Sequence, residues 1–398
     1  MAKPSLAILS PVLPYPALAG GTVHLTNAVL QLAKSYTTRL YALSNAPEAA
    51  QWGPLAEVCA ETAAFAPTPR QGFGLAPPAV RLEYSAGLIA HLERVWAADP
   101  PAVVLLEFTS MAQYAPLARR FGATVVCTAY NVAFVAQIRR ARMQRGLGMQ
   151  ARRWLGALSL WLYELRTLRQ CDLVVALSDF DRDALRRWLP QTRIEYVPSG
   201  VDLAQWPVSR AAEAGPEVLF VGNYFHPPNV EGAEWLARKV WPLVRQQCPA
   251  ARLTLAGRSP SAAIQALAAP DIQVPGTVDD LHGLYRQSSV VVVPIFWGSG
   301  VRIKILEALA CGLPLVTTAL AAEGIDLVDG QSALYAQTPA AFAAAIVQLL
   351  GDPAARARIG DAGRRVVERD YDWQQVGARL AALYAEVGDR ESGIGDRN

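Results

Sequence analysis

The sequence predicts an α/β protein built on parallel β-sheets. Val290–Val293 is a short run of β-branched residues, which is typical of a strand buried on both faces. A glycine-containing loop and an amphipathic helix follow this run, and Leu315 begins the next apolar segment. Residues 6–35 show the same order of strand, loop and helix. Parallel sheets are expected because a helix between two strands returns the chain to the same end of the sheet.

Length and composition favour a globular protein of two domains. The chain has 398 residues, of which 52% are hydrophobic and 18% are charged. The net charge of +3 gives no nucleic-acid signature, so no nucleic-acid partner is expected. The five cysteines are scattered without a Cys-x-x-Cys pair, and they predict neither a disulfide framework nor a zinc site.

The sequence shows neither a secretory signal nor a membrane-spanning segment. The first apolar run is short and interrupted by prolines, and no uncharged apolar stretch is long enough to cross a bilayer. We therefore expect a cytoplasmic protein. Asp179, Asp181 and Asp183 have the spacing of metal ligands, but acids in a first helical turn are explained by the helix dipole. We expect no bound metal.

The loop and helix after Val290–Val293 predict a phosphate-binding site. The residues that distinguish this stretch are Gly298, Ser299, Gly300, Arg302, Lys304 and Glu307. The glycines allow close approach of the backbone, and the helix start and the two cations suit a phosphate. The glutamate lies one turn further on, where it can accept hydrogen bonds from hydroxyl groups. The alternative is an ordinary ion pair between Lys304 and Glu307, with a solvated arginine.

This stretch resembles the nucleotide-binding segment of family 4 glycosyltransferases, a retaining family with the GT-B fold. One branch of the family has the pattern Gly-x-Gly-x-Arg-x-Lys-x-x-Glu, and Gly298, Gly300, Arg302, Lys304 and Glu307 match it. The resemblance implies that the glutamate binds the ribose of the donor. Other members carry an additional glutamate near the donor sugar, where this chain has Ser299, so recognition of the sugar is open.

The resemblance implies two Rossmann-like domains with parallel sheets that face each other across a cleft. Residues 1–202 would form the acceptor domain, and residues 203–372 the domain that binds the nucleotide sugar. A last helix over 373–387 would cross back to the first domain. The donor would be a UDP- or GDP-sugar, no metal would be required, and the acceptor would be a carbohydrate or a lipid-linked hydroxyl compound.

Two further segments of the first half resemble cleft loops of the family. Gly20 and Gly21 stand where a glycine pair faces the donor diphosphate, or they only permit a tight turn. Tyr130 and Asn131 stand where the related branch has His-Asn, so we expect them to hydrogen bond in the cleft. The alternative for Asn131 is a helix cap.

In the second half, the resemblance adds three residues to the expected nucleotide site. Gly222 ends the first strand of this half, and Asn223 stands in the place of a phosphate-binding arginine. Val278 precedes a helix in a region that passes near the nucleotide base in the family. His24 and His226 lie near expected cleft loops and are minor candidates.

Residues 138–170 combine eight arginines with a single acid, Glu164. Trp154, Trp161 and several leucines lie among the arginines. This pattern suits an interfacial helix on an anionic membrane surface. The alternative is a solvated basic surface whose aromatic residues face the core.

The predicted function is transfer of a sugar from a nucleoside diphosphate to a hydroxyl group, in polysaccharide or glycolipid biosynthesis. Arg302 and Lys304 would stabilise the leaving diphosphate, where negative charge develops in the transition state. Two other classes of function stay open: a sugar-nucleotide epimerase of the same fold, and a non-catalytic protein that binds nucleotide sugars. The sequence does not identify the acid and base residues that an epimerase requires.

Overall fold

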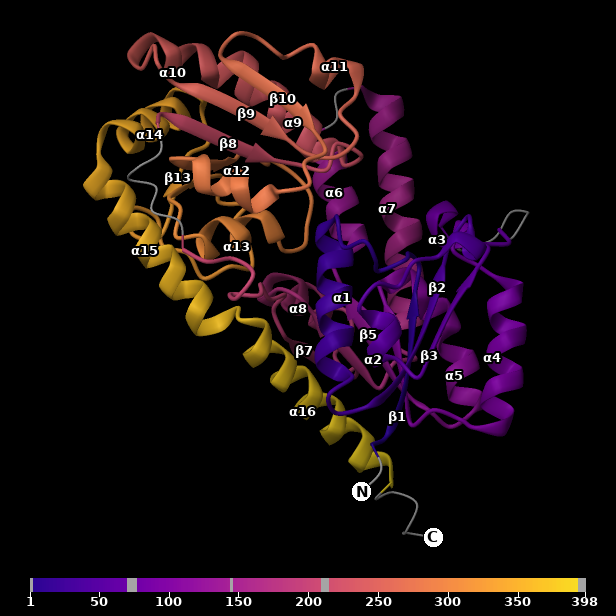
Figure 1. Ribbon diagram of the computed structural model, residues 1–398. Helices are drawn as coiled ribbons and strands as arrows, with labels where there is room; N and C mark the ends of the chain where they lie inside the picture. Colours follow the sequence, from indigo (N-terminus) through magenta and orange to yellow (C-terminus); the bar gives the residue numbers. More distant parts are fainter. Residues whose placement is uncertain (1–2, 70–76, 144–145, 209–214, 393–398) are drawn as a thin grey trace. The chain divides into compact units, whose positions relative to one another are not determined.

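The computed structural model describes residues 3–69, 77–143, 146–208 and 215–392. The chain divides into two compact units, which are Met1–Ser199 with Trp373–Asn398, and Gly200–Asp372. Each unit contains one parallel sheet with helices packed on it, as the sequence predicted (Figure 1). Arg145, which belongs to the arginine-rich stretch, lies outside the described residues.

The first unit contains a seven-stranded sheet in the order β3-β2-β1-β4-β5-β6-β7, in which every pair is parallel. Its strands are β1 (Ser5–Ser10), β2 (Thr37–Leu43), β3 (Glu61–Phe65), β4 (Val103–Glu107), β5 (Thr124–Ala129), β6 (Leu173–Ala176) and β7 (Ile194–Tyr196). The strand order reverses between β1 and β4. In open parallel sheets, ligands bind beyond the carboxyl ends of the strands at such a switch point.

Helices cover both faces of this sheet. They are α1 (Gly20–Leu32), η1 (Pro47–Ala49), α2 (Leu55–Val58), α3 (Pro78–Leu82), α4 (Ala86–Ala98), η2 (Thr109–Tyr114), α5 (Ala115–Arg120), α6 (Ala133–Met143), α7 (Leu147–Leu168), α8 (Asp179–Arg186) and α16 (Trp373–Ser392). The last of them, α16, packs against α1, and Trp373, Leu380 and Tyr384 join Leu25 and Val29 in one apolar core. The C-terminal helix is therefore part of the first unit.

The second unit contains a six-stranded parallel sheet in the order β10-β9-β8-β11-β12-β13. Its strands are β8 (Glu217–Val221), β9 (Arg252–Ala256), β10 (Ile272–Gly276), β11 (Val290–Val293), β12 (Leu315–Thr317) and β13 (Leu334–Tyr335). The four valines of β11 are fully buried, as expected for a strand between two others with helices on both faces. The switch point of this sheet lies between β8 and β11.

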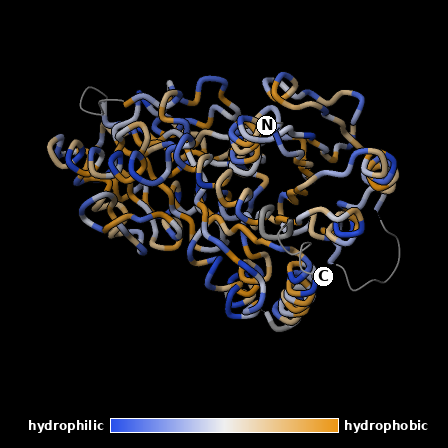
Figure 2. Tube along the Cα trace, turned by 90° about the horizontal axis from the view of Figure 1, so that it is seen from below, coloured by the Kyte–Doolittle hydropathy of each residue, from blue (hydrophilic) through white to orange (hydrophobic). Residues whose placement is uncertain are grey.

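Helices connect most of these strands, and two more follow β13. They are α9 (Pro227–Trp235), the π-helix η3 (Leu236–Val240), α10 (Trp241–Gln247), α11 (Ala262–Gln265), α12 (Leu281–Gln287), α13 (Ile303–Ala310), α14 (Pro339–Gly351) and α15 (Pro353–Asp370). Figure 2 shows hydrophilic and hydrophobic residues alternating along the helical turns, as amphipathic helices on a sheet require. No described helix is both long and apolar enough to cross a bilayer.

Local contacts explain the ends of several elements. α1 begins at Gly20, where Thr22 hydrogen bonds back to Ala19 and closes the first turn. The short edge strands β3 and β13 had no clear sequence signal, since edge strands lack the uninterrupted apolar run of a central strand. Ser178 caps α8 as predicted, accepting from the Asp181 N–H at 3.0 Å.

Candidate active site

The glycine loop after β11 leads directly into α13. Gly298 and Gly300 have φ values of 116° and 83°, which favour glycine, and both residues are half-buried with Ser299 between them. Arg302 is the N-cap residue of α13 with extended backbone, and its guanidinium donates to the Gly300 carbonyl. Arg302 therefore lies in the loop and not within the helix, which is the position from which it and Lys304 can approach one anion.

Lys304 is the second residue of α13, and residues of the β8–α9 segment hold its side chain in place. Its Nζ donates to Asn229 Oδ1 at 2.8 Å and lies 4.7 Å from the centre of the Phe220 ring. Burial lowers the pKa of Lys304 to about 7, and the nearby Arg302 cation acts in the same direction. An anion at this place would restore the full positive charge of the lysine.

Glu307 lies one turn further along α13 and is only 9% exposed. Its Oε2 accepts a hydrogen bond of 3.1 Å from the hydroxyl of Tyr285, which comes from α12. Burial raises the pKa of Glu307 to about 7, while Tyr285 and Lys304 act against this rise. The structure therefore places a buried glutamate and a half-buried lysine, both with pKa values near neutrality, beside the glycine loop. Perturbed groups of this kind concentrate in functional sites.

The segment after β8 forms the neighbouring wall of this site at the switch point. Asn229 Nδ2 donates to the Asn223 carbonyl at 2.8 Å, so the residue that holds Lys304 also shapes this loop. A Cβ atom on Gly257 would lie only 1.6 Å from the Gly222 carbonyl oxygen. This close approach of two backbones explains glycine at position 257, whose φ is 145°.

Two weaker candidates lie near the same edge of the second sheet. Val278 is half-buried in the connection between β10 and α12, after Gly276 with a φ of 78°. Asp280 caps α12 by accepting from the Gly283 N–H at 2.7 Å, which fixes the end of this connection. His226 lies before α9, where partial burial and the Lys304 cation lower its pKa.

In the first unit, the glycine pair and the Tyr130 loop meet at the other switch point. A Cβ atom on Gly21 would lie 3.0 Å from Phe108 Cζ. Phe108 follows β4 with a φ of 68°, an unfavourable conformation for an aromatic residue, and its ring stacks on Tyr130 at 3.8 Å. Gly20 is the first residue of α1 beside this stack. Backbone strain of this kind is often kept at functional sites.

Tyr130 is half-buried beside the Glu107 carboxyl group. Burial raises the pKa of Glu107 to about 7, and burial together with Glu107 raises the pKa of Tyr130 well above its ordinary value. Asn131 is exposed and lines a small cavity of about 150 Å³ with Ser110 and Tyr163. Both residues therefore border this cavity, Tyr130 half-buried and Asn131 exposed.

His24 lies against Tyr130. Its Nδ1 is 2.9 Å from Ser199 Oγ, and its ring packs edge-on against Tyr130 at 5.0 Å and near Trp373 at 5.2 Å. Burial lowers the pKa of His24 to about 3, so the imidazole is neutral at pH 7. Its burial favours a packing role. The described residues contain no group of three or more His, Cys, Asp or Glu side chains that could hold a metal ion.

Comparisons with known proteins agree with this geometry. Residues 18–205 match the model of Glycosyltransferase Family 4, and residues 215–352 match that of Glycosyl transferases group 1. The chain belongs to the group 1 glycosyltransferases. The glycogen synthase of Mycobacterium tuberculosis is 28% identical over 281 residues, which cover 66% of either chain. A phosphatidyl-myo-inositol mannosyltransferase of Mycobacterium leprae is 30% identical over 224 residues, covering 54% of this chain and 59% of the relative.

Solved structures show that this group 1 glycosyltransferase has the GT-B fold. Sucrose-phosphate synthase from Thermosynechococcus elongatus superposes with a TM-score of 0.77 at 20% identity, covering 96% of this chain and 99% of that one. HepE of Anabaena, in complex with UDP and glucose, superposes with a TM-score of 0.69 at 14% identity, covering 95% and 99%. The curated relatives are matched over less than two thirds of their own length.

Sequence reasoning missed several residues of this group 1 glycosyltransferase that shape its candidate sites. They are Glu107, Phe108, Glu164, Phe220, Asn229 and Tyr285. Glu107 carried a usable signal, since it is an acid at the end of an otherwise apolar strand. His91 likewise has a carboxylate partner that the sequence did not reveal, Glu61, at 3.0 Å.

Proposed function

We propose that the chain transfers a sugar from a UDP- or GDP-sugar to a hydroxyl acceptor, with retention of the anomeric configuration. The observation that carries the proposal is a pair of groups with near-neutral pKa values, the half-buried Lys304 and the buried Glu307, beside the glycine loop at the switch point of the second sheet. In this proposal residues 203–372 bind the donor, and residues 1–202 with 373–387 bind the acceptor.

The donor side would act by stabilising the leaving group. The bond between the anomeric carbon and the diphosphate oxygen breaks, and the electron pair stays on the diphosphate. Arg302, Lys304 and the α13 N-terminus stabilise this growing negative charge. Glu307 would accept hydrogen bonds from the ribose hydroxyls. Backbone groups of Gly222, Asn223, Gly298, Ser299 and Gly300 would surround the phosphates, and Val278 would border the base.

The new bond would form on the face that the diphosphate leaves. The acceptor hydroxyl attacks the anomeric carbon, and its proton moves to the departing diphosphate oxygen, so the configuration is retained. This route requires no general base from the protein and no metal. Asn131 borders a small cavity and would orient the acceptor, and Tyr130 would support this loop through its stack on Phe108. In this proposal Gly20 and Gly21 would approach the diphosphate.

The acceptor proposal follows from the α6–α7 region. Residues 138–170 would attach the protein to the anionic inner face of a membrane from the cytoplasm, where it would act in polysaccharide or glycolipid synthesis. The support is the outward apolar face of α7, on which Leu155, Leu158 and Leu162 are 67%, 50% and 50% exposed among arginines.

The HepE structures contain UDP, UDP-glucose, or UDP with glucose, which supports a nucleotide-sugar donor here.

A donor screen tests the proposed function. The full chain is heated with UDP, GDP and their sugars, and we expect one nucleotide class to raise the melting temperature. The stabilising donor is then incubated with hydroxyl acceptors, and the anomeric configuration of the product is read by NMR. Release of nucleotide that depends on acceptor, with retained configuration, supports the proposal. An isomerised sugar nucleotide would indicate an epimerase, and binding without turnover would indicate a binding protein.

A further inference from the structure

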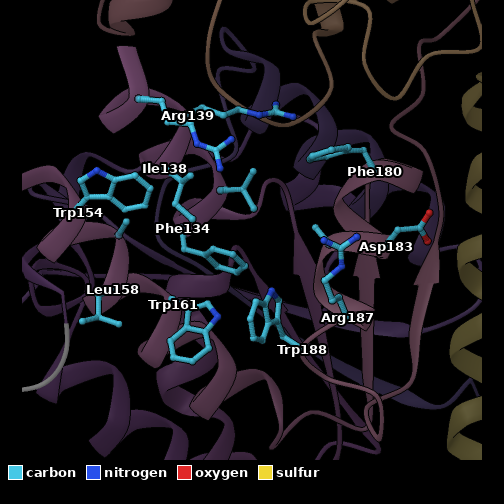
Figure 3. Close-up of a pocket in the computed structure, with 14 residues that line it drawn as sticks. Phe134, Ile138, Arg139, Trp154, Leu158, Trp161, Phe180, Asp183, Arg187 and Trp188 are labelled. Atoms are coloured by element: carbon cyan, nitrogen blue, oxygen red, sulfur yellow. The ribbon is translucent and has the colours of Figure 1, made fainter. Parts of the chain in front are cut away.

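The first unit contains a large groove between α6, α7 and α8 (Figure 3). Its volume is about 900 Å³, within the range of about 300–1,000 Å³ typical of ligand pockets. Its lining includes Phe134, Ile138, Arg139, Arg142, Trp161 and Trp188. None of the residues expected to bind the nucleotide sugar borders this groove.

Aromatic and aliphatic side chains dominate the walls of the groove. Trp161 of α7 and Trp188, just beyond α8, meet edge to face at 5.3 Å, and Phe134 is buried behind them. Figure 3 shows these rings gathered around one space, with Trp154 and Leu158 at the side. Such a surface suits a flexible hydrocarbon chain, because it offers apolar contact without demanding fixed hydrogen bonds.

Positive charge lies on two walls of the same groove. Arg139 and Arg142 come from α6 and Arg187 follows α8, so the cations reach it from different elements. The Arg139 guanidinium lies 4.5 Å from the centre of the Phe180 ring. The acid that lines the groove, Asp183, is engaged by Arg182 at 2.7 Å. The charge of the lining therefore favours an anion, and arginine is well suited to phosphate.

The groove and the Asn131 cavity meet at the start of α6. Ala133 lines the small cavity, and the next residue, Phe134, lines the groove. Glu164 of α7 fixes this point by accepting from the N–H groups of Ala133 and Phe134 at 3.2 and 3.1 Å. The groove therefore adjoins the small cavity that Asn131 borders.

We propose that this groove binds the hydrocarbon chain of a phosphate-bearing amphiphile, with the phosphate on Arg139, Arg142 and Arg187. This inference rests on the proposed function, and it makes the acceptor a single lipid-linked molecule bound in a defined site. The apolar face of α7 continues outward from the groove through Trp154 and Leu158, so the chain can enter from a bilayer. The charge of the groove and this continuity favour a lipid over a protein partner.

Direct binding of dodecyl phosphate below its micelle concentration tests the site. Titration calorimetry and quenching of tryptophan fluorescence by a chain-brominated analogue report occupancy. We expect Arg142→Gln with Arg187→Gln, and separately the groove-filling Ala184→Trp, to weaken binding at least tenfold. Arg365→Gln and Val58→Ser are matched controls, because these exposed residues lie outside 138–170 and do not line the groove; both variants should bind dodecyl phosphate as the wild type does. Thermal unfolding verifies that each variant is folded.

The alternatives give different results. Equal binding of dodecyl phosphate and dodecyl maltoside would overturn the proposal, because the arginines would then contribute nothing. Full competition by inorganic phosphate at similar concentration would show a headgroup site without a chain site and would also overturn it. The proposal would also be overturned if the protein self-associates and Ala184→Trp abolishes this self-association. The groove would then be occupied by a second copy of the chain. UDP titration of the same samples separates the two proposals, since groove variants should retain nucleotide binding.

Discussion

Lys304 and Glu307 illustrate how the candidate donor site is built from single residues. Both side chains lose water contacts, and burial moves their pKa values toward 7 from opposite sides. Besides each other's charge, their hydrogen-bond partners are neutral, namely Asn229 for the lysine and the Tyr285 hydroxyl for the glutamate. Such a site is stabilised when a diphosphate and a ribose supply the missing charge and hydrogen bonds.

Replacing Glu307 tests the ribose contact. We expect Glu307→Ala to weaken UDP or GDP binding by about 1.5–3 kcal/mol, the range for hydrogen bonds to charged groups. The unfolding free energy should change little, because removing the carboxylate also removes the cost of burying it. Glu307→Gln, which keeps the shape of the side chain, is the matched comparison. Calorimetric titration measures both variants, and unchanged affinity in both would exclude Glu307 from the site.

We expect Lys304 to make nucleotide binding depend on pH. Above pH 7 the free protein holds this lysine mostly neutral, and a bound diphosphate raises its pKa again, so binding takes up a proton. The affinity for UDP should therefore fall as pH rises above 7, by at most about tenfold per pH unit for one proton. Lys304→Gln should flatten this alkaline limb. Calorimetry at pH 8 in buffers of different ionisation enthalpy counts the protons, and equal proton uptake by both proteins would contradict the assignment.

At the scale of elements, buried polar contacts hold helices and loops in place. Glu164 of α7 accepts from the first N–H groups of α6 and from Thr109 Oγ1 at 2.8 Å. It therefore supplies to α6 the cap that Asn131 was expected to provide as an alternative to cleft bonding. This contact ties the α6–α7 pair together at the point where the groove and the small cavity meet.

Removing this cap should destabilise the first unit. We expect Glu164→Ala to lower the free energy of unfolding by about 1–3 kcal/mol, because three buried donors lose their acceptor. Glu164→Gln should cost less, since its amide oxygen still accepts. Urea denaturation measures both. Glu93→Ala, which breaks an exposed ion pair with Arg120, is the control and should change stability by about 0–1 kcal/mol. An equal effect of Glu164→Ala and Glu93→Ala would argue against a structural cap.

The contact between the loops after β8 and β9 offers a second test at this scale. Gly257→Ala would place a methyl group against the Gly222 carbonyl, so we expect a loss of about 1–3 kcal/mol or more and weaker UDP binding. Gly351→Ala meets no atom within 4 Å at the end of α14 and should be neutral or stabilising. Thermal unfolding and UDP titration compare the two. Normal nucleotide affinity in Gly257→Ala would separate this loop from the donor site.

At the scale of the whole molecule, the arginine-rich pair α6–α7 should govern attachment to membranes. We expect sedimentation with anionic vesicles at low salt, since each arginine near the surface contributes about 1 kcal/mol. Arg139, Arg140 and Arg142 changed together to serine should lose this binding, and high salt should abolish it in the wild type. Neutral vesicles should bind poorly. Equal sedimentation with neutral and anionic vesicles would favour an acceptor that is not held in a membrane.

The sequence alone determined the local architecture and one chemical motif. The buried valine run, the glycine loop and the periodic helix predicted β11, the loop and α13, because period, turn residues and burial are encoded within a few neighbouring positions. The spacing of Arg302, Lys304 and Glu307 predicted a phosphate-binding loop, because these residues are also close neighbours in the sequence. The sequence could not predict the near-neutral pKa values of Lys304 and Glu307, because the desolvation of a group depends on every atom that surrounds it in the folded protein.

Only the tertiary structure decided which distant residues complete these sites. Asn229 is hydrogen bonded to Lys304, which is 75 positions away in the sequence, and Glu164 is hydrogen bonded to Ala133, which is 31 positions away. These pairs form because strand order brings the loops after β8 and β11 together and because α7 folds back along α6. The groove of about 900 Å³ is likewise a product of packing, since its walls come from α6, α7 and the region of α8. Periodicity identified amphipathic helices there, but which apolar faces stay uncovered depends on how the helices pack.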